Sequence, residues 1–129
     1  MIQSLRTNKT VTIASATSIS AALDLGGYRI AALDMSSGWD AANRMTFRVS
    51  NDATSTNPTF YDLYDDAGNE FKIASGTPLT SATGRSIIPN VDLVLALAAH
   101  RYLKIQSGPS SAPVNLTTGV TIGVVLAPF

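Results

Sequence analysis

The stretch Arg101–Gly108, with the sequence Arg-Tyr-Leu-Lys-Ile-Gln-Ser-Gly, decides the fold class of this chain. Its two aliphatic residues, Leu103 and Ile105, alternate with residues that face the opposite way, which is the period of a half-buried β-strand. The strand is expected to end at Gly108, because glycine readily adopts the dihedrals of a tight turn. We therefore predict a late, central strand of a β-sandwich, entered from the apolar segment that precedes it.

Short alternating segments of the same kind recur along the chain between turn signals. Within Tyr28–Ser36 the apolar residues change parity, so we predict a β-bulge near Ala31 or Ala32. Turns are predicted at Gly26–Gly27 and Asp65–Asn69, and the second favours a β-hairpin. Strands are expected at Lys9–Ala14, Ser18–Leu25, Tyr28–Ser36, Arg44–Ser50, Phe60–Tyr64, Glu70–Ala74, Arg85–Ile88, Arg101–Ser107 and Val120–Leu126.

The segment Arg44–Ser50 has the most regular alternation. Its odd-numbered residues are large and apolar and are expected in the core. Its even-numbered residues, such as Thr46 and Ser50, are expected to point outward. The final strand, Val120–Leu126, likewise keeps its aliphatic residues on one parity.

The segment Asn90–His100 differs from the rest because it has no period of two and is rich in Leu and Ala. Asn90 is a suitable N-cap for a short helix. Apolar residues would lie on all sides of that helix, so we predict a buried helical turn and not a surface helix.

Together these elements predict an all-β fold, an antiparallel β-sandwich of about eight strands with one short helical turn. Residues 1–8 are polar and aperiodic and are expected to form an extended N-terminal arm. Residues 9–129 are expected to form a single domain, as the length of 129 residues indicates.

The composition allows two readings, a surface of uncharged polar residues or a surface that is partly buried against partners. Only 14% of the residues are charged, and nine acidic residues balance nine basic ones. When charges are few and the net charge is zero, copies of the chain repel each other only weakly. The basic residues are scattered singly, which argues against a nucleic-acid partner. The longest apolar run, Val91–Ala99, is too short to span a membrane, and no apolar leader is visible at the N-terminus, so we expect no membrane export.

The acidic group around the predicted hairpin is the best candidate for a metal site. Calcium prefers six to eight oxygen ligands, which carboxylates and carbonyls supply. The spacing does not match a helix–loop–helix calcium motif, so a solvated hairpin turn is the alternative. The group comprises Asp62, Asp65, Asp66, Asn69 and Glu70.

No constellation in the sequence predicts catalysis. His100 is the single histidine and follows an apolar segment, so a structural role is expected. The chain has no cysteine, no Gly-x-Ser-x-Gly setting and no phosphate-binding loop. We therefore expect no enzyme activity, no catalytic or metal-binding residues, no cofactor and no small-molecule substrate.

Two further features allow two readings each. Trp39, Tyr61 and Tyr64 offer aromatic faces for stacking on a sugar, or they fill the ends of a small sandwich. The N-terminal arm and the apolar end Val124–Phe129 offer an edge for pairing with another chain, or they are a frayed start and an ordinary last strand.

Several segments, in this order and spacing, resemble a family of small tailed-phage virion structural proteins. The resemblance extends from about Val11 to Phe129. The run at residues 101–108 is also similar to the late core strand of galactose-binding-like jelly rolls, which implies a jelly-roll-like sandwich. The segments are Leu25–Arg29, Gly38–Ala42, Met45–Ser50, Asp62–Glu70 and Arg101–Gly108.

The resemblance implies a structural role in the virion. The expected function is that of a capsid decoration, or cement, protein that binds the major capsid protein as a homotrimer and stabilises the phage head. Such a protein is made in the host cytoplasm and resides on the capsid surface. The alternative is a receptor- or glycan-binding module of a phage tail or fibre, with Trp39 and the tyrosines at its site.

Overall fold

The computed structural model describes residues 6–40, 42–52, 59–75, 79 and 84–129, so residues 1–5 of the expected arm lie outside it. This part of the chain contains nine strands and one helix. In chain order they are β1 (Thr7–Ile13), β2 (Leu23–Asp24), β3 (Arg29–Met35), β4 (Met45–Ser50), β5 (Tyr61–Asp62), β6 (Lys72–Ile73), β7 (Arg85–Ile87), α1 (Val91–Ala98), β8 (Tyr102–Ser107) and β9 (Val120–Ala127).

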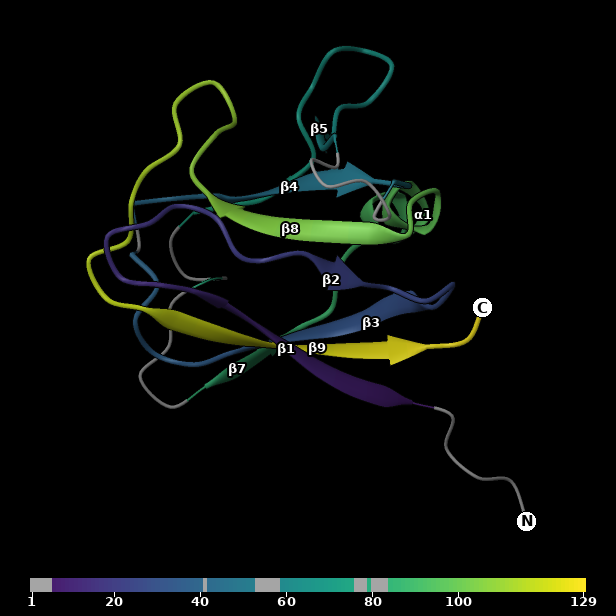
Figure 1. Cartoon of the computed structure of the whole chain (residues 1–129), viewed down its shortest axis with the longest axis horizontal. Coiled ribbons are helices and arrows are strands. Elements are labelled where there is room, and N and C mark those ends of the chain that lie inside the picture. Colours follow the sequence, from purple (N-terminus) through teal and green to yellow (C-terminus); the bar gives the residue numbers. More distant parts are fainter. Residues whose placement is uncertain (1–5, 41, 53–58, 76–78, 80–83) are drawn as a thin grey trace.

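The strands form two antiparallel sheets that pack face to face (Figure 1). One sheet has the order β1-β9-β3-β7, and the other has the order β2-β8-β4-β5, with β6 also paired to β4. β9 therefore lies between β1 and β3, and β8 lies between β2 and β4. The predicted all-β sandwich with one short helix is confirmed, and so is the central position of the Arg101–Gly108 strand.

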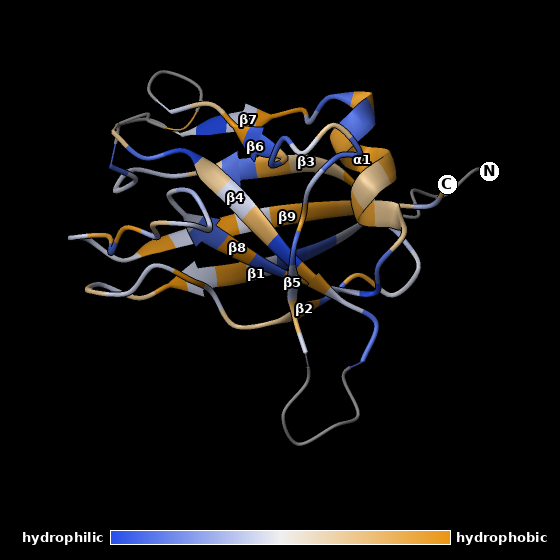
Figure 2. Ribbon diagram, turned by 90° about the horizontal axis from the view of Figure 1, so that it is seen from above, coloured by the Kyte–Doolittle hydropathy of each residue, from blue (hydrophilic) through white to orange (hydrophobic). Residues whose placement is uncertain are grey.

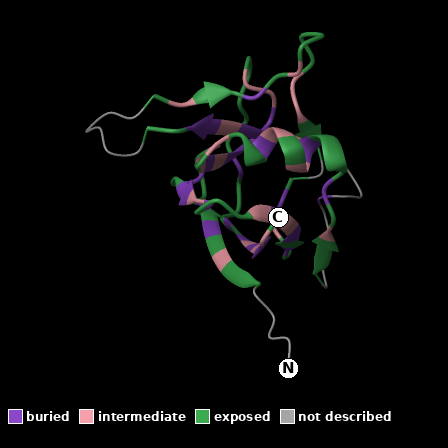
Figure 3. Cartoon of the chain, turned by 90° about the vertical axis from the view of Figure 1, so that its right-hand side faces the viewer, coloured by how far each residue is buried: buried purple, intermediate pink, exposed green. Residues whose placement is uncertain are grey.

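The core lies between the two sheets, and Figure 3 shows the buried residues gathered along the strands. Leu103 and Ile105 of β8 are fully buried, as predicted, and so are the odd-numbered residues of β4. Burying a side chain of this size stabilises the fold by about 1.5–3 kcal/mol. The largest fully buried side chains are Phe47, Ile13, Leu25, Ile30, Leu33, Met45, Leu79, Leu97, Leu103, Ile105, Leu116 and Ile122.

The outer face of β4 and β8 is less exposed than the sequence predicts. The expectation that Thr46 and Ser50 face solvent is wrong, since both are buried, as is Gln106 on β8. The chain turns at Gly108 and folds back over this face, where Thr46 Oγ1 donates to the Gly108 carbonyl (2.7 Å). Alternation assigns a residue to one face of a strand, but it does not say what covers that face.

The predicted β-bulge in β3 is confirmed. Ile30 is paired with Leu126 of β9 and Ala32 with Val125, so Ala31 is the extra residue. This one insertion resets the alternation and lets aliphatic side chains on both sides of it reach the core.

The turn at residues 65–69 forms as predicted, and the residues next to it pair across it, with Phe71 N donating to the Leu63 carbonyl (3.0 Å). Asp65 N donates to the carbonyl of Asn69 (2.8 Å), and one bridge joins Tyr64 to Glu70. β5 and β6 both pair with β4, so they are two pieces of one interrupted edge strand. The predicted hairpin therefore forms, but it is short, because the free edge of β4 takes the outer parts of both flanks as its partners.

The helix α1 begins as predicted but is not buried. The Asn90 side chain accepts a hydrogen bond from Leu93 N (2.9 Å), which confirms the N-cap. Leu93 and Leu97 are buried, whereas Val91 and Leu95 are exposed. The prediction of a buried helical turn is wrong, because the chain covers only one side of an apolar helix that packs on β3.

The first and last strands of the described chain, β1 and β9, both lie in the β1-β9-β3-β7 sheet. β1 includes Thr7 and Asn8 of the expected arm, and these residues pair with Leu126 and Val125. Because β9 has a partner on each side, Val124–Phe129 contains an interior strand, and the idea that it offers an open edge is wrong.

Substitution of Gly108 tests how closely the chain packs against itself where it folds back after β8. A Cβ at this residue would lie 2.9 Å from Val114 N, and its φ of +85° already disfavours other residues. Gly68 is the matched control, with a φ of +84° and nothing within 4 Å of its Cβ position. We expect Gly68→Ala to cost about 1–2 kcal/mol of unfolding free energy.

We expect Gly108→Ala to cost roughly a further 1–3 kcal/mol because its methyl group has no space. Urea denaturation measures both losses. Equal losses for the two variants would contradict the close contact between residues 108 and 114.

Candidate functional site

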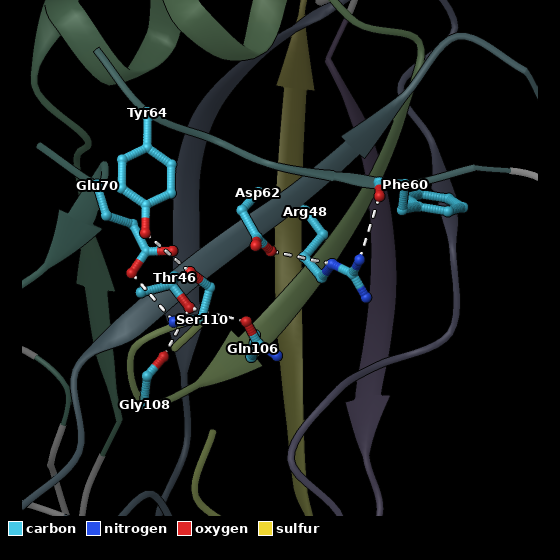
Figure 4. Close-up of polar contacts among 9 residues, drawn as sticks. All are labelled: Thr46, Arg48, Phe60, Asp62, Tyr64, Glu70, Gln106, Gly108 and Ser110. Atoms are coloured by element: carbon cyan, nitrogen blue, oxygen red, sulfur yellow. Dashed lines mark hydrogen bonds and ion pairs between the residues drawn. The ribbon is translucent and has the colours of Figure 1, made fainter. Parts of the chain in front are cut away.

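Polar side chains gather on the outer face of the sheet that contains β4 and β8 (Figure 4). Arg48 of β4 stands directly opposite Lys104 of β8 in the strand register. Two like charges at such a position repel each other. The neighbouring edge of the sheet relieves this repulsion with one carboxylate and one aromatic ring.

Asp62 and Phe60 supply these two groups. Arg48 Nε lies 3.1 Å from Asp62 Oδ1 in an ion pair whose geometry is not that of a hydrogen bond. The other end of the guanidinium donates from Nη2 to the carbonyl of Phe60 (3.1 Å). The Lys104 ammonium lies 4.5 Å from the centroid of the Phe60 ring, within the range of a cation–π contact.

Asp65 and Glu70, on either side of the turn, have separate partners. Asp65 Oδ1 accepts from Asn69 N (2.8 Å) and holds its own turn closed. Glu70 Oε1 accepts from Ser110 N (3.1 Å), and the hydroxyls of Tyr64 and Ser110 lie 3.1 Å apart, so the hairpin contacts the loop after β8. Across the described ranges, no three His, Cys, Asp or Glu side chains meet in a group that could hold a metal ion.

A hollow of about 370 Å³ lies where β4 and α1 end, and we name it the His100 hollow. His100 Nδ1 lies 3.3 Å from the Ala96 carbonyl, one helical turn back. No hydrogen bond to a described residue engages the hydroxyls of Thr59 and Tyr61, two residues that line the hollow. Its described lining residues are Ser50, Asn51, Asp52, Thr59, Tyr61 and His100.

Asn51 builds the wall between this hollow and a second one of about 480 Å³. Its Oδ1 accepts from Arg101 N (2.8 Å), and its Nδ2 donates to the carbonyl of Ala99 (3.3 Å). The side chain thus ties the end of β4 to the segment between α1 and β8. Gly26 and Gly27 line the far side of the second hollow.

Asp24 and Arg101 form a two-point ion pair beside the second hollow. Arg101 Nε and Nη2 lie 3.2 Å from Asp24 Oδ1 and Oδ2, respectively. The hydrogen bond from Arg101 lowers the pKa of Asp24 below its ordinary value of 3.8, helped by a hydrogen bond from Gly26 N and opposed by partial burial. The same carboxylate raises the pKa of Arg101.

The three aromatic candidates do not gather at one site. Trp39 is only 4% exposed, and its Nε1 donates to the Asn43 carbonyl (2.9 Å), so its ring belongs to the core. Tyr64 lies on the hairpin. Tyr61 is 65% exposed and lines the His100 hollow.

Sequence reasoning missed the His100 hollow. Asn51, Tyr61 and His100 come from three segments, and no local pattern places them side by side. The predicted ends of strands and helices do indicate where along the chain these side chains lie. Only the pairing of β4 with β5 and β8 brings the segments together.

The Asp24–Arg101 pair predicts a pH dependence of stability. A carboxylate with a depressed folded-state pKa adds stability above its unfolded pKa and loses it as the pH falls through the folded pKa. We expect Asp24→Asn to lower the thermal unfolding midpoint slightly at neutral pH, since exposed pairs contribute little. The difference from the wild type should vanish well below pH 3.8.

Asp66→Asn is the control, because the Asp66 carboxylate has no partner among the described residues. It removes one charge without removing an ion pair. If both variants show the same pH profile of unfolding, the pair has no specific role.

Comparison with protein-family models, with curated proteins and with solved structures gives no match. In the part of the chain that the structure describes, no helix is long and apolar enough to cross a membrane.

Proposed function

We propose that the protein is a structural component of a tailed-phage particle, a capsid decoration protein that binds the major capsid protein and stabilises the head. One observation carries the proposal. Every residue of helix α1 except Asp92 is apolar, but the chain covers only the side that holds Leu93 and Leu97. A helix of this kind is normally buried on all sides, so its outer face needs a partner.

Exposed apolar residues lie on α1, whose ribbon has mostly hydrophobic colours in Figure 2, and in the segment before it, and we name these residues the α1 patch. It consists of Ile88, Val91 and Leu95, which are 73%, 66% and 60% exposed. Contiguous apolar surface of this kind marks protein–protein contact sites. Asp92 is the one charged residue of the helix, so docking here desolvates little charge.

The strand order supports a jelly-roll assignment of the sandwich, which we also propose. The chain passes repeatedly between the sheets, and each sheet interleaves early and late strands. In both sheets a late strand, β9 or β8, returns between two early ones, as in a pair of Greek keys. Jelly rolls are recurrent in viral capsid proteins.

The proposal includes the homotrimer and the capsid-surface location that the family resemblance implies. It assigns no catalytic residue, cofactor, nucleic acid or membrane. The protein would act by burying its surface across joints between capsid subunits, and permanent contacts of this kind bury on the order of 2,000 Å² or more.

Leu95→Glu tests the α1 patch. We expect this variant to lose at least about tenfold in affinity for capsids that lack the protein, because a carboxylate at the centre of the patch must be desolvated. Co-sedimentation with such capsids measures the loss. Val114→Glu is the control, since Val114 is an exposed aliphatic residue in the loop after β8, at the other end of the sandwich (Figure 1).

Both variants should keep the thermal midpoint of the wild type, because neither side chain is in the core. Unchanged binding by Leu95→Glu, or equal losses for both variants, would contradict the proposed contact.

A receptor- or glycan-binding module of a tail or fibre is the second candidate. The exposed Tyr61 ring at the His100 hollow favours it, since a ring beside free hydroxyl, carboxylate and imidazole groups suits a polyhydroxylated ligand. Trp39 has no part in this version because its ring is buried.

Tyr61→Ala tests this second candidate on an array of bacterial surface glycans. We expect it to abolish any signal that the wild type gives, while Tyr64→Ala, an equal truncation away from the hollow, keeps it. An array without wild-type signal, or a signal that survives Tyr61→Ala, would count against a glycan site here.

A further inference from the structure

We propose that β1 pairs edge to edge with β1 of a second copy of this chain, about a twofold axis at Thr10. The contact extends the β1-β9-β3-β7 sheet from one copy into the next. It uses a different surface from the α1 patch, and it does not depend on the capsid role.

The four sheet edges in the described part of the chain differ greatly in length. β2 has two residues and β7 has three, while β5 and β6 have two each and are separated by the excursion at residues 63–71. Short and interrupted edges resist pairing with other chains. β1 alone is long, with seven residues.

The outer edge of β1 is also regular. The strand pairs with β9 over all seven residues without a register shift, and it contains no Pro or Gly. Among the described residues no backbone hydrogen bond reaches β1 from its other side. The outward N–H and C=O groups of an edge strand seek partners, and a second extended strand supplies all of them at once.

Lys9 is the single charged residue of β1 and the one feature that opposes pairing, since lysine often protects an edge. Its ammonium is drawn inward, where Nζ donates to the carbonyl of Asp24 on β2 (2.8 Å). The charge therefore points toward β2 of the other sheet and does not project from the β1 edge toward a second copy.

The charge of Lys9 also selects the register of the pair. A twofold axis at Lys9 would set two ammonium groups opposite each other, which is unfavourable. An axis at Thr10, the middle residue of β1, sets Lys9 opposite Val11 and pairs all seven residues. It also keeps the buried faces of both copies on the same side, because paired residues then share parity.

The outer face of β1 suits this register. Thr10 would stand opposite Thr10 of the second copy, and Thr12 opposite Asn8. Such hydroxyl pairs already exist in the sheet, since Thr12 Oγ1 and Thr121 Oγ1 lie 3.0 Å apart across β1 and β9. Cross-strand Thr pairs stabilise antiparallel strands.

Opposite charges at Thr10 test the contact. In the proposed register Thr10→Lys and Thr10→Glu each place like charges face to face, so each variant alone should associate at least about tenfold more weakly than the wild type. An equimolar mixture of the two should associate again, because lysine then faces glutamate. Light scattering after size exclusion should give the wild type at least twice the mass of either variant.

Thr121→Lys is the control, since it adds the same charge to an exposed residue of the interior strand β9. It should keep the wild-type mass. A wild type with the same mass as Thr10→Lys, or a mixture that fails to associate, would overturn the proposal.

A second variant keeps the test decisive if a charged residue at Thr10 disturbs folding. The chain has no cysteine, so Thr10→Cys introduces the only thiol. We expect mild oxidation to link two copies of this variant, because directly opposed residues have their Cβ atoms about 4.5–5.5 Å apart. Thr121→Cys should stay unlinked, and equal linkage of the two variants would also overturn the register.

Discussion

The insertion of the last strand, β9, between β1 and β3 is the interaction on which the rest of the structure depends. Val120, Ile122, Val124 and Leu126 are all buried, and β9 forms ladders along both of its edges. Without β9 the first sheet has no connection between β1 and β3, and the inner face of β8 loses its counterpart. The chain must therefore bring together residues more than a hundred positions apart, which is entropically costly and makes folding slow.

This arrangement also decides which surfaces remain for other molecules. Because the last strand takes an interior place, the first strand is left at the edge, where no described residue bonds to its outer backbone groups and a second copy is proposed to pair. Helix α1 packs on β3 with one side only, and the sandwich has nothing further to place over Leu95. The two contacts proposed for this protein thus follow from one topology, and they lie on separate parts of the molecule.

Much of the fold could be predicted from the sequence because its causes are local. Alternation located β4, β8 and β9, the change of parity predicted the bulge at Ala31, and Asn90 identified the helix start. The errors arise where contacts between segments far apart in the sequence determine burial or strand pairing. Thr46 and Gln106 are buried because a loop returns over them, and β5 and β6 pair with β4 because its edge is free. The exposure of α1 and the meeting of Asn51, Tyr61 and His100 depend on packing between elements, which no local pattern contains.

The central claim is that a capsid partner covers the outer face of α1. Hydrogen exchange of the protein, free and bound to capsids that lack it, tests this claim most directly, because a short surface helix opens readily unless a partner holds it. The account predicts that amides in Val91–Ala98 exchange more slowly in the bound protein. Unchanged exchange in α1 together with protection of another surface would contradict it.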